Sequence, residues 1–132
     1  MAQLTGMTLI KNGIAITQMI NFGQPRVGDP KYAAFSDEKW TTQWRMVHHK
    51  DIVPHNPGEA WPLDYYHTST EIYEDKDPSI YKTCAKGEDP TCADQWWTFS
   101  IDDHLNYMGK PMGSDGATSC AVKANDAPKW FL

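Results

Sequence analysis

Hydrophobic residues recur at near-helical spacing at the start of this chain. Leu4, Met7 and Ile10 lie three residues apart, and the dipeptide N-G follows as a typical helix stop. This spacing predicts a helix over residues 1–11. No Ser, Thr or Asp precedes the segment as an N-cap, which is what a chain that begins inside an element would look like.

The next three segments alternate between strand and helix patterns. Residues 14–22 are apolar and partly β-branched, and glycine and proline bound them, which predicts a buried strand. Residues 30–40 begin with a proline, which suits a first helical position, and their aromatic residues supply an apolar face. Residues 42–48 follow as another strand. Helix and strand therefore alternate, which predicts the α/β class.

Further along, two more strands are predicted at residues 67–73 and 79–84, after an irregular stretch rich in proline. A last helix is predicted to begin near Ser100, because acidic residues follow in its first turn. Asp51 falls just past the strand at 42–48. Open α/β sheets place their functional loops at such strand ends, so Asp51 is a candidate site residue.

The charge balance argues against several classes of partner. The chain has 132 residues and a formal net charge of −5, and its basic residues are scattered. Nucleic-acid binders gather basic residues on one face, so DNA and RNA are not expected partners. No apolar run approaches the ~20 residues that span a bilayer, and no signal-peptide pattern is present.

The three cysteines are unevenly spaced. Cys84 and Cys92 flank the short polar segment A-K-G-E-D-P-T, whose glycine and proline permit a turn that brings the two sulfurs together. Cys120 is left over. The alternative to a bond between Cys84 and Cys92 is that all three cysteines are reduced thiols in a cytosolic protein. No C-x-x-C spacing indicates zinc or redox chemistry.

Histidines and carboxylates cluster in the middle of the chain, and their spacing fits no closed metal site. The cluster consists of His48, His49, Asp51, His55 and His67. We therefore predict hydrogen-bonding roles for the histidines, and neither a metal nor a cofactor. Arg26 is expected to pair with a carboxylate or with carbonyls, with substrate binding as the alternative.

Paired aromatic residues precede the last predicted helix. Trp96 and Trp97 stand beside Phe99, and such groups anchor a core more often than they face lipid or substrate. We expect core packing. Among six serines, Ser114 in M-G-S-D-G comes nearest to a nucleophile elbow, but it lacks the glycine two residues earlier and is rejected.

Four ordered motifs resemble class 3 lipases, the fungal triacylglycerol lipase family. They are N-F-G-Q-P-R-V-G-D-P, W-R-M-V-H-H-K-D-I-V-P-H, H-T-S-T-E-I-Y and D-D-H-L-N-Y-M-G. The resemblance covers residues 1–120, read as the C-terminal half of a lipase domain, and leaves 121–132 as a tail. It implies an incomplete α/β-hydrolase domain, with a mixed or parallel sheet flanked by helices.

Position by position, the resemblance assigns roles to individual residues. Asp51 matches the acid and His104 the base of a serine hydrolase triad. The family's local disulfide falls on Cys84 and Cys92, and Cys120 matches a cysteine whose partner lies near the N-terminus. Supporting positions near the site are taken by His55, His67 and Arg26.

The nucleophile is the departure from the family pattern. The first residues match the helix that follows the family's G-H-S-L-G-G motif, and no G-x-S-x-G elbow occurs in this sequence. We therefore expect a fragment of a lipase for acylglycerols or related lipid esters, which is inactive alone. The alternative is a non-catalytic remnant that binds a lipid or a protein. The family and the cysteines imply secretion and contact with a lipid–water interface.

Overall fold

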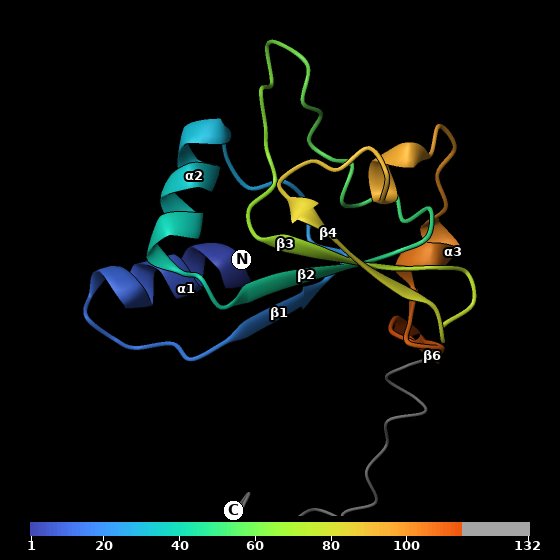
Figure 1. Cartoon of the computed structure of the whole chain (residues 1–132), viewed down its shortest axis with the longest axis horizontal. Helices are drawn as coiled ribbons and strands as arrows, with labels where there is room; N and C mark the ends of the chain where they lie inside the picture. The colour runs from blue at the N-terminus through green and yellow to red at the C-terminus, as the bar shows by residue number, and fades with distance from the viewer. Residues whose placement is uncertain (115–132) are drawn as a thin grey trace, which may run out of the picture.

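The computed structural model describes residues 1–114, and Figure 1 shows two helices at one end of a sheet and the loops of a candidate site at the other. Helix α1 (Ala2–Lys11) and helix α2 (Pro30–Lys39) confirm the two predicted helices. Asp29 caps α2, because its carboxylate accepts a hydrogen bond from the Tyr32 amide at 2.8 Å.

The sheet contains four strands in the order β1-β2-β3-β4. β1 (Met19–Phe22), β2 (Gln43–His48) and β3 (Thr70–Glu74) run parallel, and β4 (Tyr81–Lys86) is antiparallel to β3. The sheet is therefore mixed, as predicted. β1 forms one edge, and no strand within residues 1–114 pairs with its outer side.

The predicted strand at residues 14–22 is wrong in its first half. Only Met19–Phe22 pairs with β2, and Ile14 is 51% exposed. Apolar residues are buried only where a neighbouring element covers them. The pairing of β1 with β2 begins at Met19, so the residues before Met19 have no partner strand. The strand predicted at 67–73 begins later, at Thr70, because Ser69 bends the chain with a φ of 67°.

Polar side chains join the two helices to the sheet. Gln3 of α1 is buried, and its Nε2 donates to Ser36 Oγ at 2.7 Å and to Gln43 Oε1 at 3.0 Å. Gly6 lies so close to the Trp40 ring that a Cβ at this position would clash with the ring carbons. These contacts hold both helices at the amino ends of the parallel strands.

Residues 93–111 form short elements, most of which the sequence did not predict. Helix α3 (Ile101–His104) begins after Ser100, whose hydroxyl accepts from the Asp103 amide at 3.1 Å, as expected of an N-cap. The 3-10 helix η1 (Ala93–Gln95) and the hairpin of β5 (Asn106–Tyr107) and β6 (Lys110–Pro111) were not predicted. Such short elements lack a measurable periodicity. None of the helices in residues 1–114 is long and apolar enough to cross a bilayer.

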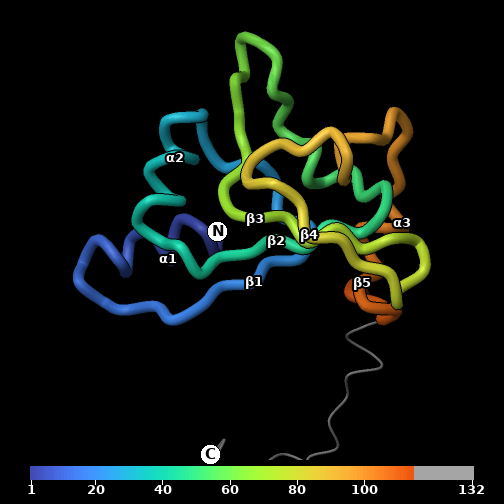
Figure 2. The backbone as a smooth tube through the Cα atoms, viewed as in Figure 1, coloured from blue at the N-terminus to red at the C-terminus, as the bar shows by residue number. Residues whose placement is uncertain are grey.

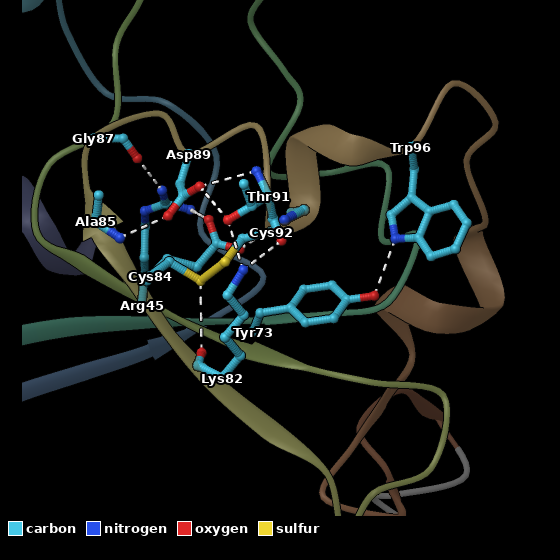
Figure 3. The surroundings of a disulfide bond; sticks show 12 residues. Arg45, Tyr73, Lys82, Cys84, Ala85, Gly87, Asp89, Thr91, Cys92 and Trp96 are labelled. Atoms are coloured by element: carbon cyan, nitrogen blue, oxygen red, sulfur yellow. Dashed lines mark hydrogen bonds and ion pairs between the residues drawn. A yellow bond between two sulfur atoms is a disulfide. The ribbon is translucent and has the colours of Figure 1, made fainter.

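The disulfide between Cys84 and Cys92 is present, which confirms the predicted pairing. It closes the loop after β4, and both cysteines belong to the buried cluster that also contains Val47, Tyr73 and Ala93. Figure 3 shows the surroundings of the bond, with the Asp89 carboxylate accepting from the backbone of Ala85 at 2.8 Å. From there the chain passes beside the loop after β2 and reaches α3 (Figure 2). Cys120 lies outside the described residues.

Loss of this disulfide should lower the free energy of unfolding by about 2–3 kcal/mol, because the bond restricts a short loop in the unfolded chain. Replacing both Cys84 and Cys92 with alanine tests this by urea unfolding under non-reducing conditions. A reducing agent should destabilise the wild type and leave the double variant unchanged. Equal stability of oxidised and reduced wild type would contradict the prediction.

Candidate active site

The candidate site lies at the carboxyl ends of β1 and β2, where three separate segments meet. Gly23 directly follows β1, Asp51 comes three residues after the end of β2, and His104 ends α3. Because neighbouring parallel strands end at the same edge of a sheet, the loops that follow them lie together. The fold thus brings Asp51 and His104 into contact although 53 residues separate them.

The Asp51 carboxylate is completely buried and accepts three hydrogen bonds. Its Oδ2 lies 2.9 Å from His104 Nδ1 and also accepts from the Tyr107 hydroxyl, while Oδ1 accepts from the Val53 amide at 2.8 Å. A carboxylate accepts, so His104 Nδ1 carries the proton. Its other nitrogen, Nε2, has no hydrogen-bond partner within residues 1–114, and the side chain is 30% exposed.

Glycine is the only residue type that fits at position 23, beside Asp51 and His104. Its φ is +58°, and a Cβ at this position would lie 2.7 Å from both Asp51 Oδ2 and His104 Nδ1. Glycine therefore satisfies both a left-handed backbone and a close approach. The N-F-G motif contains this glycine, but the sequence gives no sign of what it faces.

The loop that follows β2 and carries Asp51 (the acid loop) is joined to the start of α3 by backbone hydrogen bonds. The Ser100 amide donates to Lys50 O at 2.8 Å, and the Ile52 amide donates to Ser100 O at 3.3 Å. Asp103 Oδ2 accepts from His49 Nδ1 and from the Lys50 amide, both at 3.0 Å. Although partial burial opposes the effect, these hydrogen bonds lower the pKa of Asp103. The bonds fix the distance between acid and base.

The histidines expected to support the site bind backbone carbonyls. His55 Nδ1 donates to Asp51 O at 2.9 Å, and His67 Nε2 donates to Pro54 O at 2.9 Å. Burial keeps the pKa of His67 well below its ordinary value, and the nearby Arg45 adds to this effect. Both side chains therefore hold the loop that carries Asp51.

Potential metal ligands come close together in two places within residues 1–114, and neither includes a histidine. One combines Glu71 with Cys84 and Cys92, whose sulfurs are bonded to each other. The other is the acidic cluster around Arg26, formed by Glu59, Glu88 and Asp94.

Arg26 pairs with carboxylates and a carbonyl, as expected. Its guanidinium lies 3.0 Å from Glu88, 2.6 Å from Glu59 and 3.6 Å from Asp94, and donates to Pro57 O at 3.2 Å. Despite burial, the hydrogen bond from Arg26 lowers the pKa of Glu88 to about 2. Burial and the charge of Glu88 raise the pKa of Asp94 to about 7 in spite of Arg26. Arg26 thus links the acid loop to the loop that the Cys84–Cys92 disulfide closes.

The expectation of core packing for the aromatic group is wrong for two of its three members. Trp97 is 95% exposed and Phe99 is 45% exposed. Trp96 alone is partly buried, and its Nε1 donates to Tyr73 Oη at 3.0 Å. The turn at η1 buries Ala93 and directs the next residues outward, which an aromatic count in the sequence does not reveal.

Tyr107 is a site residue that the sequence analysis missed. It is 1% exposed, and its ring packs edge-on against Phe22 and His48, with centroid distances of 5.6 and 5.8 Å. The motif D-D-H-L-N-Y places it three residues after His104, near the same turn. This spacing was the available signal, but the short helix ends before Tyr107.

The sequence matches the family described as Lipase (class 3) over residues 1–61. It is 36% identical to a Rhizomucor miehei lipase over 90 residues, which is 66% of this chain and 24% of that protein. Its structure resembles lipase II from Rhizopus niveus with a TM-score of 0.78 and 29% identity, over 86% of this chain and 44% of the other.

A second solved structure is a triacylglycerol lipase described as having a serine protease triad at its catalytic centre. It matches with a TM-score of 0.73 and 29% identity, over 85% of this chain and 44% of the other. The chain therefore spans less than half the length of each of these three relatives.

Replacing Gly23 with alanine should separate Asp51 from His104, because the added Cβ would clash with both side chains. We expect the variant to lose the downfield Nδ1 proton resonance of His104 and to be several kcal/mol less stable. Gly13→Ala is the matched control. Gly13 also has a positive φ, of +78°, but within residues 1–114 no atom beyond its two chain neighbours lies within 4 Å of the Cβ position. It should cost only about 1 kcal/mol of backbone strain.

Asp94 should make stability fall as the pH rises. Its folded-state pKa of about 7 exceeds the ordinary value of 3.8, so between these values the folded chain binds a proton that the unfolded chain has lost. The contribution of Asp94 to the free energy of unfolding is complete below about pH 4 and is lost as the pH rises toward 7. Over the same range His67 acts in the opposite direction, because burial lowers its pKa. The decline in the free energy of unfolding from pH 5 to pH 8, measured with urea, is therefore compared between variant and wild type, and it should be smaller for Asp94→Asn.

Asp77→Asn is the control for this measurement, because hydrogen bonds from Ser79 lower the pKa of the exposed Asp77. Its titration falls below pH 5, so the decline between pH 5 and pH 8 should equal that of wild type. An unchanged decline in Asp94→Asn would contradict the assignment of the proton to Asp94.

Proposed function

Because the chain belongs to the class 3 lipase family, we propose that it contributes the acid and the base of a serine ester hydrolase that acts on acylglycerols or related lipid esters. The observation that carries the proposal is the hydrogen bond between His104 Nδ1 and the buried Asp51 carboxylate. The free Nε2 of His104 is the atom that would face a serine hydroxyl.

In the proposed reaction His104 Nε2 accepts the serine proton while the hydroxyl oxygen attacks the ester carbonyl. His104 then donates this proton to the leaving alcohol, and a water molecule enters in the same way to release the acid. Asp51 keeps the proton on Nδ1, so that Nε2 is the basic nitrogen. Its negative charge stabilises the imidazolium that forms in both steps.

Burial makes Asp51 suited to this role. A charge held away from water acts more strongly on its neighbour than a solvated one, and fixed hydrogen bonds avoid reorganisation during the reaction. The Val53 amide holds one carboxylate oxygen and leaves the other directed at His104. His55 and His67 support the same loop through carbonyl groups.

The serine is proposed to come from outside residues 1–132, since these contain no G-x-S-x-G elbow. The same fact favours the alternative, a non-catalytic lipase-like module that binds a lipid or a protein. The disulfide supports a secreted protein, because such bonds persist in oxidising compartments. Contact with a lipid–water interface is proposed from the family alone.

Purified residues 1–132 should hydrolyse p-nitrophenyl butyrate no faster than an unrelated protein, because the proposal places the nucleophile and its oxyanion donors outside these residues. A longer polypeptide that restores the upstream half of a lipase domain, with a G-H-S-L-G-G segment directly ahead of residue 1, should be active. In that polypeptide, Asp51→Asn and His104→Ala should each lower kcat by at least about a thousandfold.

Asp102→Asn is the matched control for the longer polypeptide, because Asp102 lies in the same short helix as His104 and is exposed. It should retain wild-type activity. An active longer polypeptide that tolerates His104→Ala would overturn the assignment of the base. Activity of residues 1–132 alone, abolished by His104→Ala, would show that a nucleophile lies within them.

A further inference from the structure

Tyr107 donates to the same oxygen of Asp51 that faces His104. The Tyr107 hydroxyl and His104 Nδ1 therefore share Oδ2, whereas Val53 alone occupies Oδ1. Burial, followed by the charge of Asp51, raises the pKa of Tyr107 above its ordinary value. The phenol thus remains protonated and donates throughout the working range of pH.

The position of Tyr107 is determined by the ends of three neighbouring strands. Its ring packs on Phe22 at the end of β1 and on His48 at the end of β2. The next residue, Met108, donates its amide to the buried Glu74 at the end of β3, at 2.7 Å. The hydroxyl therefore reaches Asp51 from a ring that has little room to move.

Sharing one oxygen has an electrostatic consequence. Each donor draws negative charge toward itself, so the phenol reduces the charge that Oδ2 presents to the imidazolium of His104. Removing the hydroxyl would not release the carboxylate, because the Val53 amide still holds Oδ1 and the Asp51 amide donates to His48 O at 2.9 Å. The Asp51–His104 contact would remain, with more charge on the acceptor.

We propose that Tyr107 is a positioning residue that sets the basicity of His104 by taking up part of the Asp51 charge. The hydroxyl thereby weakens the attraction of the Asp51 carboxylate for the positive charge that forms on the imidazole when Nε2 accepts a proton. The importance of this for catalysis rests on the proposed function, but the proton equilibrium of His104 can be measured without catalysis.

Other charged groups near the pair belong to the surrounding elements. From the acid loop, they include His49, Lys50 and His55, and Asp103 lies beside His104 on α3. The strand ends contribute His48 and Glu74. All of them remain when only the Tyr107 hydroxyl is removed, so a comparison of two variants isolates the phenol.

The test follows the His104 ring of the 132-residue chain by nitrogen–proton NMR as a function of pH. The His104 signal is identified by its loss in His104→Gln. In Tyr107→Phe, the pH at which His104 is half protonated should rise by about half a unit or more. Tyr73→Phe is the matched control, because it removes a hydroxyl bonded to Trp96 and should leave this pH unchanged.

A second variant preserves the shape of the site. Replacing Tyr107 with 3-fluorotyrosine makes the phenol a stronger donor, so the half-protonation pH of His104 should move in the opposite direction. An unchanged or lowered value in Tyr107→Phe would overturn the proposal and leave Tyr107 a packing role only. A fluorotyrosine variant that titrates like wild type would overturn it as well.

These outcomes are separable from a failure of the proposed function. If His104 titrates as expected but the longer polypeptide shows no esterase activity, the charge sharing holds and the catalytic role does not. If the longer polypeptide is active and depends on His104, the acid limb of its kcat/KM profile should move to higher pH in Tyr107→Phe. An unmoved acid limb would count against Tyr107 alone.

Discussion

The buried charge of Asp51 is the constraint on which the rest of the site depends. A carboxylate with no access to water is costly unless donors replace its hydration. Three donors do so, and they come from three different segments: Val53 in the following turn, His104 at the end of α3, and Tyr107 in the β5–β6 hairpin. Satisfying one charge therefore fixes where all three segments lie.

The geometry of the sheet explains why these segments meet where they do. Parallel pairing of β1 with β2 places Gly23 and the loop carrying Asp51 at the same edge. There is no room for a side chain at position 23. Because glycine has none, Asp51 and His104 can lie directly against the backbone at the end of β1. Backbone hydrogen bonds between Ser100 and the residues beside Asp51 then form an isolated parallel β-bridge, which holds the start of α3 against the loop carrying Asp51.

Around this site, covalent and ionic links hold the outer loops. The disulfide between Cys84 and Cys92 fixes the loop after β4, and Arg26 connects that loop to the one carrying Asp51 through three carboxylates. One guanidinium cannot neutralise three acids, which is why Asp94 retains its proton to about pH 7 while Glu88 does not. The loop carrying the acid is thus supported from both sides, by Arg26 and by α3.

The sequence by itself determined the features that depend on local pattern or on motif resemblance. Periodicity located α1, and a proline at the first helical position with aromatic residues behind it located α2. The short spacing of Cys84 and Cys92 permitted their pairing, and the motifs singled out Asp51 and His104. Tertiary structure decided the rest, because the decisive contacts join distant residues. Tyr107 reaches Asp51 across 56 positions. The true extent of β1 and the exposure of Trp97 depend equally on which neighbours cover them. Periodicity records the face that a residue occupies on its own element, and only packing determines what that face meets.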